Sequence, residues 1–428
     1  MKVSPSRGLQ GEVWIPPSKS HTLRALVFAA LAQGESQIEA YLDSPDTQAM
    51  IEALKLLGVQ IQVEPKKLIV QGLEGRFCPP EDVIDCGNSG QVLRFVGALA
   101  SLMESYVIFT GDHSIRHQRP VQPLLQALQQ LGAFAVSGRG DGRAPIIIKG
   151  PIVGGCCELE GGDSQPVSGL LIAAAFAPHP VEIHVNNPGE TPWIEVTLSW
   201  LKKFGIPYER RGYTRYRLEG RASVKGFHYK VPGDFSTAAF PIASALLTKS
   251  ELTLCNLDKE DVQGDKELVF LLEKMGACFS WQEEERKLHI KKSPHLEGRA
   301  IDINAMIDAL PILTVLACFA KSKTTLYNAA IARAKESDRI HAIAEELKKM
   351  GACIEEFHEG LEIYPSPLQG SRLCSYKDHR IALSLVVAAM AAEKGDSVIE
   401  DVACIKKTYP GFFETFQRLG MQAQLIEK

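Results

Sequence analysis

A helix-ending glycine recurs six times along this chain of 428 residues. Segments such as IEALKLLGV, LLQALQQLGA and AEELKKMGA have the pattern of amphipathic helices that end in a bulky apolar residue followed by glycine. Glycine just past a helix is the usual left-handed C-cap. Successive glycines lie 69 to 75 residues apart, and the six are Gly58, Gly132, Gly205, Gly276, Gly351 and Gly420. A spacing this regular predicts six structural repeats.

A second set of helical segments alternates with the first. Runs such as LRALVFAALA and LSLVVAAMAA are apolar on all sides, which predicts buried helices. Alternating runs such as VQIQVE and KLIVQG predict strands. One repeat is therefore a strand, a buried helix, a strand, an amphipathic helix and two further strands. Because the chain is too long for one core, we predict an α/β protein of two domains with three units each. The division falls near Pro232 and Gly233, which break the pattern.

Bulk properties exclude several classes of partner. A formal net charge of −4 gives no reason to expect binding to nucleic acid or to an anionic membrane. No apolar stretch is long enough to span a bilayer, and the N-terminal residues do not have the pattern of a signal peptide. The ten cysteines form no CxxC pair and no Cys/His group with zinc spacing, and most lie in apolar runs. We therefore expect buried thiols, a cytoplasmic location and no metal site.

Short polar segments precede the six buried helices. Examples are PPSKSHT, DCGNSGQ and YKDHR, which have the composition of N-caps. If three units pack around a pseudo-threefold axis, three helix N-termini emerge on one face. Two such faces opposed across a hinge would form a cleft lined by positive dipole ends, which suits a small and strongly anionic ligand.

Cations gather at these segments and at the connecting loops. Any one of them is usually a solvated surface charge, but arginine also suits carboxylates and phosphates. Lys335 and Arg339 are four residues apart, which predicts one shared helix face. The complete set is Lys19, Arg24, Arg119, Lys335, Arg339, Arg380 and Lys407.

Two carboxylates stand among these cations. Asp308 opens an apolar helix and Glu336 follows Lys335. Either carboxylate could be tuned for proton transfer by its cationic neighbours. Alternatively, Asp308 caps its helix and Glu336 is a first-turn partner of the helix dipole. Ser18 either caps its helix or forms part of an anion site, and this segment alone favours the cap. His379 could be catalytic, but a hydrogen-bonded structural role is favoured.

Four sequence motifs that occur in this order along the chain point to a known family. They are PPSKSHTLRAL, ARAKESDR, YKDHRIA and KKTYPGFF. With them the chain resembles the 5-enolpyruvylshikimate-3-phosphate synthases, or 3-phosphoshikimate 1-carboxyvinyltransferases. The resemblance implies the two-domain enolpyruvyl transferase fold, an inside-out α/β barrel of six βαβαββ units. Domain one would comprise residues 1–18 and 233–428, domain two residues 19–232, with a hinge near 16–19 and 230–234.

The resemblance also implies an activity. The enolpyruvyl group of phosphoenolpyruvate passes to the 5-hydroxyl of shikimate 3-phosphate by addition and elimination through a tetrahedral intermediate, releasing phosphate. The step belongs to the shikimate pathway, which leads to chorismate and the aromatic amino acids, and it is the target of glyphosate. The family needs no metal or cofactor, and a monomer is expected.

Residue roles follow from the same resemblance. Asp308 would accept the 5-hydroxyl proton, and Glu336 would pass a proton to the methylene carbon of phosphoenolpyruvate. The expected ligands of shikimate 3-phosphate are Lys19, Ser20, Arg24, Ser164, Gln165, Asp308 and Lys335. The expected ligands of phosphoenolpyruvate are Lys19, Gly90, Arg119, Gln165, Arg339, Arg380 and Lys407.

Five positions depart from the family pattern. Gln91 and Phe95 stand where many members have threonine and proline, so we predict an altered glyphosate sensitivity. Asp163, Glu190 and Trp193 also differ and bear on the shikimate side.

Three alternative functions fit the sequence less well than this activity. The sister enzyme acting on UDP-N-acetylglucosamine shares the repeat, but it usually carries a reactive cysteine in the loop that corresponds to GDHSIRHQRP, which has none. A non-catalytic anion-binding protein would not favour two carboxylates in a cationic cleft. A purely structural repeat protein does not need cations at its helix starts.

Overall fold

The structure is a computed structural model that describes all residues except 294 and 427–428. Contacts divide the chain into two compact units. Unit 1 is Met1–Pro16 with Pro232–Lys428, and unit 2 is Pro17–Val231. These bounds differ from the predicted domain limits by at most two residues. The role of the two crossing segments as a hinge stays a prediction.

Unit 2 contains three four-stranded sheets. In each sheet the first two strands are parallel and the other two pairings are antiparallel. The strand orders are β14 (His228–Lys230), β3 (Gln33–Glu39), β5 (Lys67–Leu73), β4 (Gln60–Glu64); β6 (Ile84–Asp85), β7 (Val107–Thr110), β9 (Ile146–Lys149), β8 (Phe134–Ser137); and β10 (Gly155–Glu160), β11 (Val181–Asn186), β13 (Arg215–Leu218), β12 (Tyr208–Arg211).

Unit 1 repeats the same pattern in three further sheets. Each again pairs two strands in parallel and the others antiparallel. The strand orders are β2 (Gln10–Trp14), β15 (Glu251–Cys255), β17 (Lys287–Lys291), β16 (Cys278–Gln282); β18 (Ala300–Asp302), β19 (Thr324–Tyr327), β21 (Gly360–Tyr364), β20 (Cys353–Phe357); and β22 (Arg372–Cys374), β23 (Ser397–Glu400), β1 (Lys2–Val3), β24 (Ala423–Gln424).

Two helices accompany each sheet, as the sequence predicts. The apolar set is α1 (Lys19–Leu31), α3 (Gly90–Ala100), α6 (Ser164–Phe176), α8 (Phe235–Leu247), α10 (Leu310–Cys318) and α12 (His379–Ala391). The amphipathic set is α2 (Pro45–Leu56), α5 (Gln122–Gln130), α7 (Thr191–Lys203), α9 (Glu267–Lys274), α11 (Arg339–Lys349) and α13 (Phe412–Leu419). The six glycines that follow the amphipathic helices have φ between 66° and 111°. The six βαβαββ units are confirmed.

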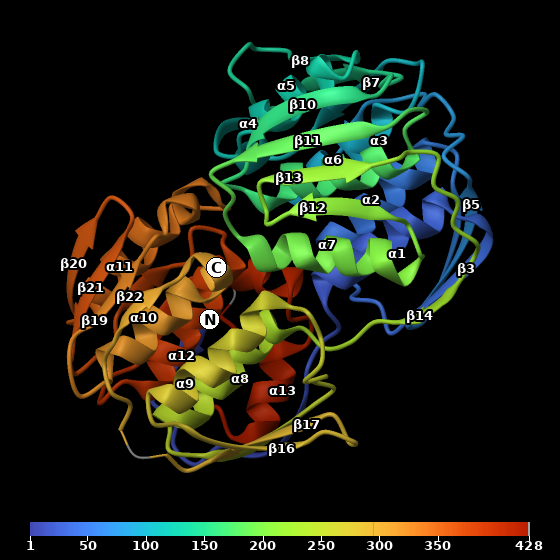
Figure 1. Cartoon of the computed structure of the whole chain (residues 1–428). Helices are drawn as coiled ribbons and strands as arrows, with labels where there is room; N and C mark the ends of the chain where they lie inside the picture. The colour runs from blue at the N-terminus through green and yellow to red at the C-terminus, as the bar shows by residue number, and fades with distance from the viewer. Residues whose placement is uncertain (294, 427–428) are drawn as a thin grey trace. The chain divides into compact units, whose positions relative to one another are not determined.

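Each unit has its own hydrophobic core around the apolar helices. In unit 1, α8, α10 and α12 contact one another, and in unit 2, α3 contacts both α1 and α6. The sheets lie around the helices at the periphery of each unit (Figure 1). The helices are therefore inside and the sheets outside, and the helix N-termini carry the polar segments described above.

The prediction that most cysteines are buried is wrong. Cys78, Cys156, Cys278 and Cys353 are exposed, and Cys374 and Cys404 are half-buried. Three of the exposed thiols lie on strands, where alternation places them on the solvent face. Among the described helices, none is long and apolar enough to cross a membrane.

Candidate active site

The first polar segment supplies both a helix cap and a buried cation. Ser18 Oγ accepts a hydrogen bond from the His21 amide at 3.4 Å, so this serine is the N-cap of α1. Nζ of Lys19 lies 3.4 Å from Oδ2 of Asp46 at the start of α2. The predicted Ser18 cap is confirmed, and the neighbouring cation Lys19 contacts a carboxylate on another helix.

Arg24 lies one turn further along α1 and is buried. Its Nε donates to Thr197 Oγ1 at 2.9 Å and its Nη2 donates to the Trp193 carbonyl at 3.1 Å. The guanidinium also lies 5.0 Å from the ring centroid of Phe95. Burial lowers the pKa of Arg24, because its charge is removed from water. An anion bound here would offset that cost.

Gly90 lies where three polar side chains converge. A Cβ at this position would lie 2.6 Å from Nη1 of both Arg119 and Arg94, and 2.9 Å from Oε1 of Gln165. Arg94 Nη1 also donates to Gln165 Oε1 at 3.2 Å. The structure thus brings together the predicted Gly90, Arg119 and Gln165, with Arg94 as an addition.

Two of the unusual residues have structural roles at α6. Asp163 is its N-cap, accepting from the Gln165 amide at 3.0 Å, and its other oxygen lies 3.1 Å from Arg94 Nη2. Buried Glu190 accepts from the Ser164 amide at 3.2 Å and from Ser164 Oγ at 3.3 Å. Glu190 and Asp163, two of the residues that depart from the family pattern, therefore hold Ser164 and Gln165 in place.

In unit 1, Arg339 joins three carboxylates. Its Nη1 lies 2.6 Å from Asp308 Oδ1, its Nη2 lies 2.8 Å from Glu336 Oε2, and its Nε lies 2.8 Å from Asp378 Oδ2. Burial acts to lower the pKa of Arg339, but the carboxylates of Asp378, Glu336 and Asp308 outweigh it and hold the pKa well above its usual value. Arg339 is therefore a permanent cation at the centre of this cluster.

Two further cations complete the cluster. Arg380 Nη2 lies 3.1 Å from Asp308 Oδ2 and donates to Ser236 Oγ at 2.6 Å. Lys407 Nζ lies 2.7 Å from Glu336 Oε1. Asp308 and Glu336 are thus each held by two cations, an arrangement suited to binding anions and to moving protons at defined atoms.

The structure excludes two alternative interpretations and contradicts one local prediction. Asp308 lies in the 3₁₀ helix Asn304–Ala309 and does not cap α10, which has no side-chain cap; its oxygens contact arginines instead. Glu336 is outside the first turn, because α11 begins at Arg339 behind its cap Asp338. Lys335 is extended, so it shares no helix face with Arg339.

Three residues that contact the candidate site residues were not predicted from the sequence: Arg94, Asp378 and Ser236. Each had a local signal. Arg94 is a lone cation within an apolar helix, Asp378 is the N-cap of α12, and Ser236 opens α8. Tertiary packing alone shows which site residues they contact.

A sequence profile described as EPSP synthase (3-phosphoshikimate 1-carboxyvinyltransferase) matches residues 3–416. The chain belongs to the EPSP synthase family. The 3-phosphoshikimate 1-carboxyvinyltransferase of Chlamydia felis is 46% identical over 430 residues, covering 99% of this chain and 94% of the relative. That of Acetivibrio thermocellus is 43% identical over 427 residues and covers 100% of both chains. A solved EPSP synthase from Acinetobacter baumannii matches with a TM-score of 0.81 and 27% identity, covering 98% of each chain.

The predicted resemblance and fold class are confirmed. EPSP synthase membership makes the protein a transferase, and the two-domain inside-out α/β fold agrees with the solved EPSP synthase.

Proposed function

We propose that the side chains gathered in units 1 and 2 carry out the reaction of the EPSP synthase family. The enolpyruvyl group of phosphoenolpyruvate passes to the 5-hydroxyl of shikimate 3-phosphate, giving 5-enolpyruvylshikimate 3-phosphate and phosphate. The proposal rests on one observation: the guanidinium of Arg339 contacts both proposed acid–base carboxylates. Its nitrogens lie 2.6 Å from an oxygen of Asp308 and 2.8 Å from an oxygen of Glu336.

In unit 1, the proposed chemistry assigns one proton transfer to each carboxylate. Asp308 takes the 5-hydroxyl proton as the hydroxyl oxygen attacks C2 of phosphoenolpyruvate. Glu336 passes a proton to the methylene carbon, which becomes a methyl group in the tetrahedral intermediate. Loss of phosphate and of a methyl proton then restores the double bond. Positioned acids and bases of this kind each contribute roughly 10²- to 10⁴-fold.

The cations of unit 1 would bind the anionic groups. Arg339, Arg380 and Lys407 are proposed to hold phosphoenolpyruvate and to stabilise charge on the leaving phosphate. Because these cations contact carboxylates in the structure, bound phosphoenolpyruvate would share or replace those contacts. Lys335, extended next to Glu336, is proposed to contact shikimate 3-phosphate.

The residues of unit 2 would hold the remainder of both substrates. Lys19, Ser20 and Arg24 lie at the N-terminal end of α1, where amide groups and the dipole favour anions. Ser164 begins α6 in the same way, and Gln165 follows it. Gly90, Arg119 and Gln165 are proposed for phosphoenolpyruvate, with Lys19 contacting both substrates.

The test is phosphate release from phosphoenolpyruvate in metal-free buffer. We expect release that requires shikimate 3-phosphate and is lost in Asp308→Ala and Glu336→Ala. Release with UDP-N-acetylglucosamine instead would assign the protein to the sister enzyme. No release with either acceptor would contradict the proposal. The same proposal includes three further properties of the protein: a cytoplasmic location, a monomeric state and an altered sensitivity to glyphosate.

A further inference from the structure

A second group of reactive side chains lies on the solvent face of the sheet formed by β10, β11, β13 and β12 in unit 2. Along β11, Val181, Ile183 and Val185 are buried, so the alternate residues Glu182 and His184 point to the other face. Cys156 on β10 is paired in register with Glu182. The parallel pairing therefore places a thiol, a carboxylate and an imidazole on one face.

The potential ligand atoms of these three residues are close together. The Cys156 sulfur, a Glu182 oxygen and a His184 nitrogen all lie within 4.8 Å of one another. His184 Nε2 is 2.5 Å from Glu182 Oε1. The other oxygen, Oε2, accepts a hydrogen bond from Arg215 Nη2 at 2.8 Å. Arg215 thus fixes the carboxylate plane through one oxygen and leaves the other directed at the cluster.

We propose that Cys156, Glu182 and His184 form a surface binding site for Zn²⁺, separate from the transferase chemistry. One sulfur, one nitrogen and one oxygen are a ligand set that zinc accepts, with the fourth tetrahedral position left for water. The thiolate favours zinc over magnesium or calcium, which prefer oxygen ligands.

Binding requires a small local rearrangement and a defined proton balance. Ligand atoms about 2.0–2.3 Å from zinc lie roughly 3.3–3.8 Å apart in a tetrahedron. The His184–Glu182 hydrogen bond, at 2.5 Å, must therefore open to admit the metal ion. The thiol of Cys156 releases its proton to solvent as the S–Zn bond forms. His184 then binds through Nε2 with its proton on Nδ1.

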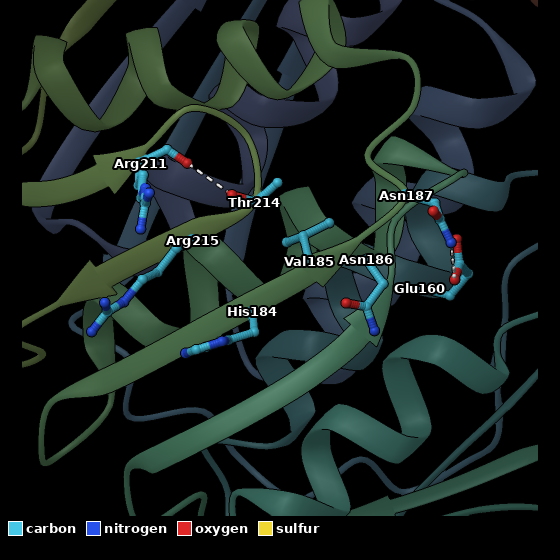
Figure 2. Close-up of a pocket in the computed structure, with 8 residues that line it drawn as sticks. All are labelled: Glu160, His184, Val185, Asn186, Asn187, Arg211, Thr214 and Arg215. Carbon is cyan, nitrogen blue, oxygen red and sulfur yellow. Dashed lines mark hydrogen bonds between the residues drawn. The ribbon is translucent and has the colours of Figure 1, made fainter.

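The side chains of His184 and Glu182 are partly exposed to solvent, and His184 lies next to a surface hollow, so they have space to rearrange around a metal ion. His184 is 45% exposed and Glu182 is 22% exposed. A hollow of about 680 Å³ lies beside His184 and Arg215 and is also lined by Asn186 and Glu160 (Figure 2). Water in this hollow can therefore reach His184. The charged side chains of the hollow are the carboxylate of Glu160 and the guanidinium groups of Arg211 and Arg215.

Cobalt and zinc titrations of the metal-free, reduced, full-length protein test the proposal. Co²⁺ is expected to bind one equivalent with the near-ultraviolet charge-transfer absorption of a thiolate ligand, and Zn²⁺ is expected to displace it. Cys156→Ser and His184→Ala are each expected to weaken Zn²⁺ binding at least tenfold. Cys278→Ser, which removes an exposed strand thiol in unit 1, is the matched control and should leave binding unchanged.

Two independent readouts keep the test decisive if a variant is less stable. Zn²⁺ should protect Cys156 of the unmodified protein from alkylation and should raise its melting temperature. Cobalt binding without thiolate absorption, or unchanged zinc affinity in folded Cys156→Ser, would overturn the proposal. The transferase activity of these variants should persist, so failure of the zinc site is distinguishable from failure of the proposed function.

Discussion

Nη1 of Arg339 lies 2.6 Å from Oδ1 of Asp308. The proposed base is therefore positioned by a buried cation whose own orientation depends on Asp378, at 2.8 Å from Nε. A change at Asp308 and a change at Arg339 should consequently have different effects. The first removes a proton acceptor, whereas the second removes the support shared by three carboxylates.

Asp308→Asn should lower kcat by roughly 10²- to 10⁴-fold, because the amide retains the shape of the carboxylate but cannot accept the hydroxyl proton. The KM for phosphoenolpyruvate should change far less. Steady-state phosphate release measures both constants. Asp302→Asn, an exposed carboxylate on β18, is the matched control. A kcat within a few-fold of the unmodified enzyme would exclude Asp308 as the base.

Glu336→Gln should abolish exchange at the methylene carbon. In deuterium oxide with shikimate 3-phosphate present, the unmodified enzyme should incorporate deuterium into recovered phosphoenolpyruvate, since addition and elimination are reversible at that carbon. The glutamine variant still offers an oxygen to Lys407, which lies 2.7 Å from Glu336 Oε1. Binding should therefore persist while exchange, followed by mass spectrometry, is lost. Undiminished exchange would assign the proton to another group.

Arg339→Gln should destabilise the protein by about 3–5 kcal/mol, because it leaves the fully buried Asp378 without its guanidinium partner. Denaturant unfolding measures the loss. Arg333→Gln is the control: Arg333 also contacts two carboxylates, Asp338 and Glu356, but it is partly exposed. Its loss should cost below about 1 kcal/mol. Equal losses in the two variants would show that burial does not set the importance of Arg339.

Gly90→Ala should impair phosphoenolpyruvate binding with little loss of stability. The three atoms nearest to the added Cβ would all be at the ends of long side chains, those of Arg119, Arg94 and Gln165, and not in the backbone. The KM for phosphoenolpyruvate should rise several-fold. Gly169→Ala is the contrasting variant, because its Cβ would lie 2.7 Å from the Arg94 carbonyl oxygen on the neighbouring helix. It should cost about 1–3 kcal/mol through overpacking. A destabilised Gly90→Ala would contradict this assignment.

Alkylation by iodoacetamide at pH 8 should label Cys156 and leave Cys157 unmodified. Cys156 is exposed, whereas burial raises the pKa of Cys157 to about 12, so its reactive thiolate is almost absent at this pH. Peptide mass spectrometry distinguishes the two neighbours. Equal labelling of both at pH 8 would show that this sheet opens readily.

The repeat can be predicted from the amino-acid sequence, since glycine caps and hydrophobic periods are local properties. The six glycines, the apolar helices and the Ser18 cap were therefore predictable, and the family motifs supplied most of the residues proposed for the site. The partners of those residues follow from the packing of the folded chain. Arg339 contacts Asp308 across 31 positions of the chain, and Cys156 reaches His184 across a strand pairing. Such contacts depend on packing and register, which bring distant residues together without leaving a local pattern.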